Sequence, residues 1–263
     1  MKKLISFIQI LAMLWAIPVA LYAQEEMPLS GSEEANRLVR EAIECSSNVQ
    51  MDRSKELVDQ ALELDKDNLM ATMMKMSFDS VYASQNKSHF EDLLESSTNE
   101  DEQELAQVWK STREDIWGTT RGPLKDVSAT IDELSEKYQK DYIVQIQLAY
   151  FSFENEQYDQ AKEIYQYLTE SYKDKAAPHN MLGYIFMKEG KMDKAKKHFD
   201  KYIALAPDLA NPYDSKGDYF MEEGDYKKAC EMYEKAYEMD PSMEWSKEKA
   251  EKAKMKAEGK EKE

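Results

Sequence analysis

The sequence has few of the residues that break regular structure or build chemical sites. Of its 263 residues only 8 are glycine and 7 are proline, which disfavours a turn-rich β-sandwich and a glycine-rich nucleotide fold. Its three histidines and two cysteines show no spacing typical of a zinc site. The motifs GxxxxGK[ST], GxGxxG and GxSxG do not occur. We therefore expect no enzyme activity, no metal and no cofactor.

Positive charge is also scarce. Lys and Arg total 35 against 52 Asp and Glu, so the formal net charge is −17. A nucleic acid is repelled by such a field, because its affinity comes from phosphates neutralised by Lys and Arg. Charged residues make up 33% and hydrophobic residues 42%, which is too apolar for a disordered chain and too polar for a multi-span membrane protein. The composition favours a folded, mostly helical body that does not bind nucleic acid.

Long apolar runs are lacking except at the N-terminus. Two lysines precede an almost wholly apolar stretch over 4–21, and polarity returns directly after Ala23. This pattern predicts a secretory signal peptide over 1–23, followed by a linker over 24–34. The alternative is an uncleaved anchor helix, for which the stretch is short. We therefore expect an exported protein, periplasmic or extracellular, with no membrane span after cleavage.

The two cysteines do not suggest a disulfide. Export would permit one, since oxidising compartments preserve such bonds. Cys45 and Cys230 lie near opposite ends of the chain, however, and an elongated fold would keep their Cα atoms beyond the ~6 Å that a disulfide requires. We expect two free thiols.

An interval of 34 residues recurs through the second half of the chain. Internal repeats of this length are typical of helical arrays. Unlike residue types share the same interval, which chance does not produce. The pairs and triplets are Ala161, Ala195 and Ala229; Tyr165, Phe199 and Tyr233; Gly183 and Gly217; Gly190 and Gly224; Pro178 and Pro212; and Pro207 and Pro241.

The pattern resembles the tetratricopeptide repeat of exported bacterial proteins, a helix–turn–helix unit. The resemblance implies an all-α fold, a right-handed α-solenoid with three clear units over 142–243. Degenerate helical repeats are expected over 35–141, and a C-terminal capping helix with a charged tail over 244–263. Trp245 is the expected anchor of the capping helix.

The degenerate part follows the interval less strictly. Segment 69–107 is longer than one unit, which predicts an insertion near Ala83–Ser88. The four methionines within 70–76 are expected in the core, with an adaptable binding surface as the alternative. Trp109 is expected in the core, whereas Trp117, next to Gly118, is a candidate for an exposed second contact or self-association point. His198 is expected to be exposed on a second helix.

The resemblance also implies a partner-binding groove, lined by the first helix of each unit. Tyr150 and Tyr184 would stack side by side along it, or alternatively pack between neighbouring first helices. Asn180 would bond a ligand backbone, while Asp214 and Asp218 would favour a Lys or Arg. The mapped positions are Ile143, Ile146, Tyr150 and Phe153; Ala177, Asn180, Tyr184 and Met187; and Asn211, Asp214, Asp218 and Met221.

The function expected from these features is a non-catalytic scaffold or adaptor in the bacterial envelope or outside the cell. It would bind a protein or peptide partner carrying an apolar or aromatic residue and a basic residue. Two alternatives stay open: an accessory subunit or sensor partnering an exported hydrolase or transport system, and a stand-alone remnant of such an enzyme. The oligomeric state also stays open.

Overall fold

The computed structural model describes residues 26–113, 116 and 127–259. Within these residues the chain is entirely helical, with thirteen helices and no strand, which confirms the all-α prediction. None of the described helices is both long enough and apolar enough to span a bilayer. The expected signal peptide and Trp117 lie outside the described residues. The helices are α2 (Glu33–Ser47), α3 (Met51–Leu64), α4 (Leu69–Phe78), α5 (Ser80–Ser96), α6 (Glu100–Ser111), α8 (Val127–Lys137), α9 (Tyr142–Glu154), α10 (Tyr158–Ser171), α11 (Ala177–Lys188), α12 (Met192–Leu205), α13 (Asn211–Glu223), α14 (Tyr226–Met239) and α15 (Glu244–Ala257).

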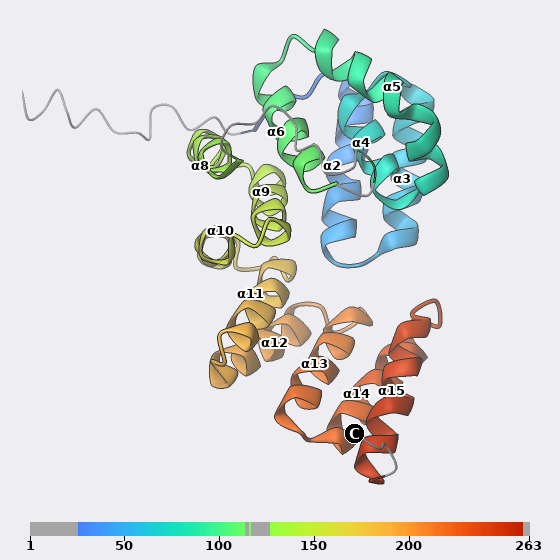
Figure 1. Ribbon diagram of the computed structural model, residues 1–263, viewed down its shortest axis with the longest axis vertical. Helices are drawn as coiled ribbons and strands as arrows, with labels where there is room; N and C mark the ends of the chain where they lie inside the picture. Colours follow the sequence, from blue (N-terminus) through green and yellow to red (C-terminus); the bar gives the residue numbers. More distant parts are fainter. Residues whose placement is uncertain (1–25, 114–115, 117–126, 260–263) are drawn as a thin grey trace, which may run out of the picture.

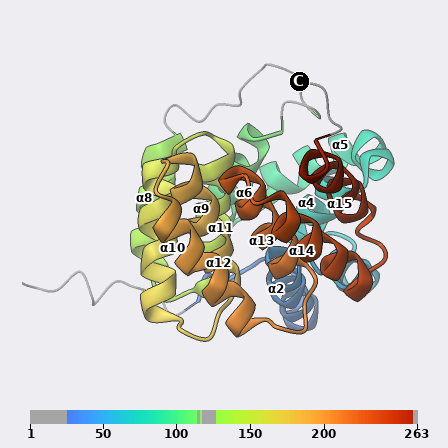
Figure 2. The ribbon, with the colours of Figure 1, turned by 90° about the horizontal axis from the view of Figure 1, so that it is seen from below.

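The helices stack as a solenoid, each contacting its neighbours in the chain. Figure 1 shows α8 to α12 as a column, with α2 to α6 beside its upper part and α13 to α15 beside its lower part. The view from below in Figure 2 places both end groups on the same side of this column. The solenoid is therefore curved, and its two ends turn toward the same side.

The helices begin where the chain offers a capping group. The Asn68 side chain accepts the backbone N–H of Ala71 at the start of α4, at 2.9 Å. Asp141 caps α9 in the same way, accepting the N–H groups of the second and third helical residues. Pro178 and Pro212 instead occupy the first turns of α11 and α13, where a missing N–H costs nothing.

Glycine lets the two helices of a regular repeat approach closely. A Cβ atom at Gly183 would lie 2.6 Å from the ring of Phe199, and one at Gly217 would lie 2.4 Å from the ring of Tyr233. Both aromatic side chains are fully buried. The repeated glycine and aromatic positions in the sequence are thus two sides of one contact, which fixes the helix spacing within each unit.

Some N-terminal details differ from expectation. Residues 83–88 lie within the continuous helix α5, so the extra length of this unit extends a helix and does not form a loop. Met27, expected in a linker, is buried, and its N–H donates to Asp141 at 2.8 Å. Arg40 of α2 holds the same carboxylate at 3.0 Å. These contacts join the start of the described chain to the first regular repeat.

The capping helix α15 packs on α14 as expected, but its anchor is different. Trp245 is 43% exposed, so the expectation that it anchors α15 is wrong. The buried residues of α15 are Ser246, Ala250 and Ala253. Small side chains suit this position because they allow two helices to approach closely.

Candidate functional site

A cavity of about 520 Å³ lies between the irregular N-terminal half and the first regular repeat. We name it the central cavity. Helices α9 and α11 form one wall, while α2, α4 and the end of α6 form the other. It therefore exists only because the two parts of the solenoid face each other across the concave side.

Part of the predicted groove lines this cavity. Ile146 and Tyr150 on α9 and Ala177 and Asn180 on α11 all face it, as the family resemblance implied. The predicted residues that lie elsewhere are Ile143, Phe153, Tyr184, Met187, Asn211, Asp214, Asp218 and Met221.

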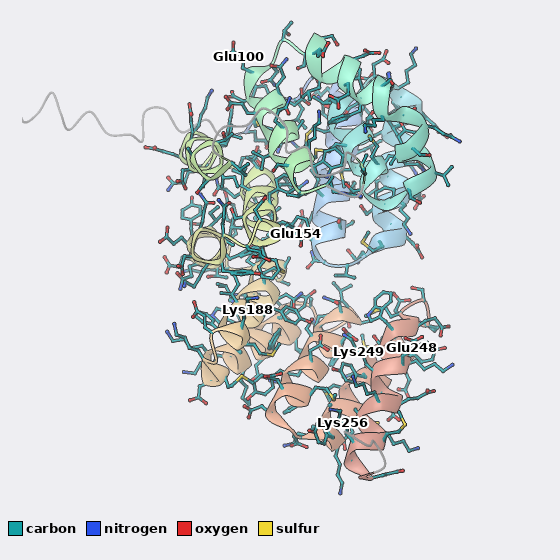
Figure 3. All side chains as sticks on the ribbon, viewed as in Figure 1. Glu100, Glu154, Lys188, Glu248, Lys249 and Lys256 are labelled. Atoms are coloured by element: carbon teal, nitrogen blue, oxygen red, sulfur yellow. The ribbon has the colours of Figure 1, made fainter. Side chains whose placement is uncertain are left out.

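Among the four predicted residues that line the central cavity, Tyr150 is the most accessible, at 45% exposed. Its pKa is raised, chiefly by burial of the hydroxyl and then by the charge of Glu154, while Arg113 opposes the shift. Glu154, at the end of α9, is exposed on the rim of the cavity (Figure 3). Arg113 lies over the Trp109 ring at 5.7 Å from its centroid. The rim near Tyr150 thus carries an aromatic ring with an acidic and a basic side chain nearby.

Asn180 supplies an unsatisfied acceptor. The side chain is 7% exposed, and within the described part of the chain its Oδ1 meets no hydrogen-bond donor. A buried amide oxygen left without a partner costs roughly 1–3 kcal/mol. Any ligand that brings an N–H to this atom would recover that free energy. Asn180 Oδ1 is therefore a hydrogen-bond acceptor available to a ligand in the cavity.

Sequence reasoning assigned the residues of the opposite wall to the core in preference to a binding surface. Met73 and Met74 of α4 are buried, which confirms their predicted place in the core, but they also line the cavity together with Trp109. Methionine is an adaptable, polarizable side chain suited to irregular contacts. The signal was the cluster of methionines on one helix, which does not distinguish a core from a cavity wall.

Tyr184 serves a different contact from Tyr150. Its hydroxyl donates to Asp218 Oδ2 at 2.7 Å, and its ring meets Phe199 edge-on at 5.2 Å between centroids. Burial raises its pKa well above the usual value, and Asp218 adds to the shift. The expectation that Tyr184 stacks beside Tyr150 along the groove is therefore wrong. Tyr184 packs between α11, α12 and α13 instead.

The predicted acidic end of the groove is occupied by the chain itself. Lys249 of α15 lies 2.8 Å from Asp214 Oδ2 and 2.9 Å from Asp218 Oδ1, and it projects from α15 toward α13 (Figure 3). Ser246 and Tyr233 donate further hydrogen bonds to these carboxylates. The expectation that they meet a basic residue of a partner is corrected, since an internal lysine already neutralises them.

The histidines also differ from expectation. His198 is half-buried, and its Nδ1 lies 3.0 Å from Nδ1 of His179 on the preceding helix. Burial lowers the pKa of His179 to about 4, and the charges of His198 and Lys201 act in the same direction. Among the described residues, no group of three or more His, Cys, Asp or Glu side chains is arranged to hold a metal ion.

The regular units match a known family. The tetratricopeptide repeat profile matches residues 176–209 and 210–243, two of the three units predicted as clear. The chain contains tetratricopeptide repeats. A tetratricopeptide repeat protein from Parabacteroides merdae ATCC 43184 has a similar structure, with a TM-score of 0.53 and 14% identity. The match covers 85% of this chain and 86% of that chain, which supports a helical-repeat fold over most of the molecule.

Two further solved structures match with lower TM-scores. YrrB, described as a tetratricopeptide repeat protein with an unusual peptide-binding site, has 18% identity and a TM-score of 0.44 over 81% of this chain and 90% of that one. The MamA protein has 15% identity and a TM-score of 0.42 over 80% and 93% of the two chains. No significant match was found among curated proteins.

Proposed function

We propose that this protein is a non-catalytic adaptor that holds an extended segment of a partner protein in the central cavity. Tetratricopeptide repeat proteins generally mediate protein–protein interaction, and two such repeats are present. The observation that carries the proposal is the buried Asn180 oxygen on the wall of an otherwise mostly apolar cavity. A polypeptide offers the N–H that this oxygen lacks.

The cavity walls define the chemistry of the segment. A backbone N–H donates to Asn180, and an apolar or aromatic side chain packs against Met73, Met74 and Trp109. Aromatic side chains gain most in such a site, because they bury a large area at low cost in conformational entropy. Tyr150 then covers the segment from the α9 side.

A basic residue of the segment would meet Glu154 at the rim. Asp214 and Asp218 are not available for it, because Lys249 already pairs with both. Glu154 is exposed and lies beside Tyr150, so a Lys or Arg there remains hydrated while its stem packs on the ring. This contact would contribute less than the apolar one, since exposed ion pairs are weak.

The proposed place of action is the bacterial envelope or the exterior of the cell. The apolar stretch over 4–21, following two lysines, supports export. Cell fractionation with mass measurement of the N-terminal peptide tests this part separately. A chain found in the cytoplasm with residues 1–23 intact would contradict it.

The binding proposal is tested with a phage-displayed library of random dodecapeptides, selected on the purified protein. The best peptide is then labelled and titrated by fluorescence anisotropy. We expect Tyr150→Ala and Asn180→Leu each to weaken its binding by about tenfold, which corresponds to roughly 1.4 kcal/mol. Tyr237→Ala, on α14 and away from the cavity, is the control and should bind as the wild type does.

Two outcomes would contradict the proposal. The first is that the library yields no peptide. The second is that selected peptides bind Tyr150→Ala and Asn180→Leu as tightly as the wild type, while circular dichroism shows both variants folded. The segment would then bind another surface.

A further inference from the structure

A second cavity of about 300 Å³ lies where the two ends of the solenoid approach each other. We name it the seam cavity. The turn between α2 and α3 forms one side, and the loops that precede α13 and α15 form the other (Figure 1). Trp245, which is 43% exposed, stands at its edge.

The two cavities share part of their walls. Val49 and Met51, in the turn between α2 and α3 and at the start of α3, line both the central and the seam cavity. The two cavities therefore adjoin at this turn. An extended chain that ran from one cavity to the other past this turn would meet these two side chains.

Val49 has an unusual backbone conformation. Its φ is +60°, in the left-handed region, where a β-branched residue is a clear outlier. Three other helix-to-helix turns hold a residue in the same region, namely Glu156 (φ +62°), Gly190 (φ +71°) and Gly224 (φ +79°). Glycine occupies the turns of the two regular repeats at no steric cost, and the unbranched Glu156 occupies the third. Val49 is the most strained of the four.

The four turns also differ in what their side chains face. Neither Glu156 nor the two glycines line the central or the seam cavity, whereas Val49 lines both. The strained side chain thus stands at the one turn where a side chain can meet something in a cavity. Local strain of this kind is concentrated at ligand contacts, where the fold tolerates it.

We propose that Val49 is a contact residue for the partner segment, which crosses it from the central cavity and continues into the seam cavity. This inference rests on the proposed function. The segment is extended, because only an extended chain spans two successive cavities in few residues. It carries an apolar side chain where it meets Val49 and Met51.

Charge complementarity favours a basic residue at the far end. Asp52, Asp208 and Asp240 line the seam cavity, and among the described residues that line it Arg53 is the one cation. Arg53 already pairs with Glu41 and Glu56, and Lys55 lies 3.7 Å from Asp52, so Asp208 and Asp240 are the carboxylates that favour a basic residue.

The test compares Val49→Gly with Glu156→Gly. Both changes remove a side chain from a left-handed residue in a helix-to-helix turn, so each should raise the melting temperature, by about 3 °C. The probe is the best dodecapeptide from the library, titrated by fluorescence anisotropy. Val49→Gly should weaken its binding by about tenfold, because a buried apolar contact is lost, whereas Glu156→Gly should leave binding unchanged.

Truncated peptides locate the crossing point. Shortening the probe from one end should weaken binding to the wild type and abolish the difference between the wild type and Val49→Gly. Shortening it from the other end should keep that difference. This pattern would show that one end of the peptide reaches past Val49.

The outcomes separate this inference from the proposed function. If Val49→Gly binds as the wild type does while Tyr150→Ala loses affinity, the segment stays within the central cavity and only this inference fails. If neither change affects binding, the proposed function fails as well. A lower melting temperature for Val49→Gly would overturn the argument from strain.

Discussion

The two halves of the solenoid are held together by different means. In the regular repeats, neighbouring helices approach through glycine against aromatic rings, as at Gly183 and Gly217. In the irregular half, polar contacts between distant segments add to the buried apolar core. Arg40 of α2 reaches Asp141 at the start of α9, and Asn68 bonds Asn36 across two helices at 2.7 Å.

The difference explains where the cavity lies. Units that repeat the same contact stack closely and leave little space between them. The irregular half attaches to α9 through buried polar groups at the start of α9 and through apolar packing beside them, while further along α9 its inner face lines the central cavity. The central cavity is the space left between a repetitive surface and a non-repetitive one.

Breaking the tie between the halves should have the largest effect. Arg40→Ala leaves the Asp141 carboxylate, whose side chain is 2% exposed, without its cation. We expect the free energy of unfolding to fall by about 3 kcal/mol, measured by urea denaturation. Arg37→Ala, on the exposed side of α2, should change it negligibly. An equal effect of the two changes would refute the distinction.

Close packing in the regular half should be nearly as sensitive. Gly217→Ala places a methyl group against the buried ring of Tyr233, and we expect a loss of about 2 kcal/mol in the free energy of unfolding. In the double variant Gly217→Ala, Tyr233→Leu the loss should be smaller than the sum of the two single losses. Additive losses would mean that the glycine is not needed for this contact.

The capping helix should contribute less. Lys249→Met leaves the nearly buried Asp214 carboxylate without its cation, although Ser246 still donates to it. Because Lys249 itself is 35% exposed, we expect a loss of only about 1.5 kcal/mol, measured by thermal and urea unfolding. The peptide affinity should not change. A large gain in affinity for a basic peptide would instead show that Asp214 and Asp218 form part of the binding site.

The smallest expected effect is a pH dependence confined to one regular repeat. The pKa of His179 is lowered to about 4 in the folded chain, against about 6.5 when unfolded. The unfolded state therefore binds more protons between these values, so stability is complete above pH 6.5 and falls as the pH drops toward 4. When the pH is lowered from 7 to 5.5, we expect the free energy of unfolding to fall by about 1 kcal/mol less in His179→Asn than in the wild type, measured by urea denaturation at each pH. An equal dependence of the free energy of unfolding on pH in the two proteins would contradict this expectation.

The sequence predicts the regular half well, because one contact recurs there at one interval. Gly217 and Tyr233 repeat the contact of Gly183 and Phe199 at an interval of 34 residues, so the contact can be recognised from the sequence alone. It predicts the irregular half poorly. Neither the pairing of Arg40 with Asp141 nor the docking of Met27 could be predicted, since nothing local marks contacts between residues so far apart in the chain.

The candidate site shows the same division. Ile146, Tyr150 and Asn180 could be predicted from the repeat, because their positions on the first helices follow the family pattern. Met73 and Trp109 were assigned to the core, and no periodicity indicated that they face α9. The assignment of Asp214 and Asp218 failed for a similar reason: Lys249 lies beyond the last repeat, where the pattern ends.

The most direct test of the account is photo-crosslinking of the selected peptide, carrying benzophenone at its central position, to the full chain. If the partner segment lies between the two halves, mass spectrometry should map crosslinks both to α4 or α6 and to α9 or α11. Arg40→Ala should weaken the crosslinks to α4 and α6 more than those to α9 and α11. Crosslinks confined to the convex helices, or to the regular repeats alone, would contradict a binding cavity shared by both halves.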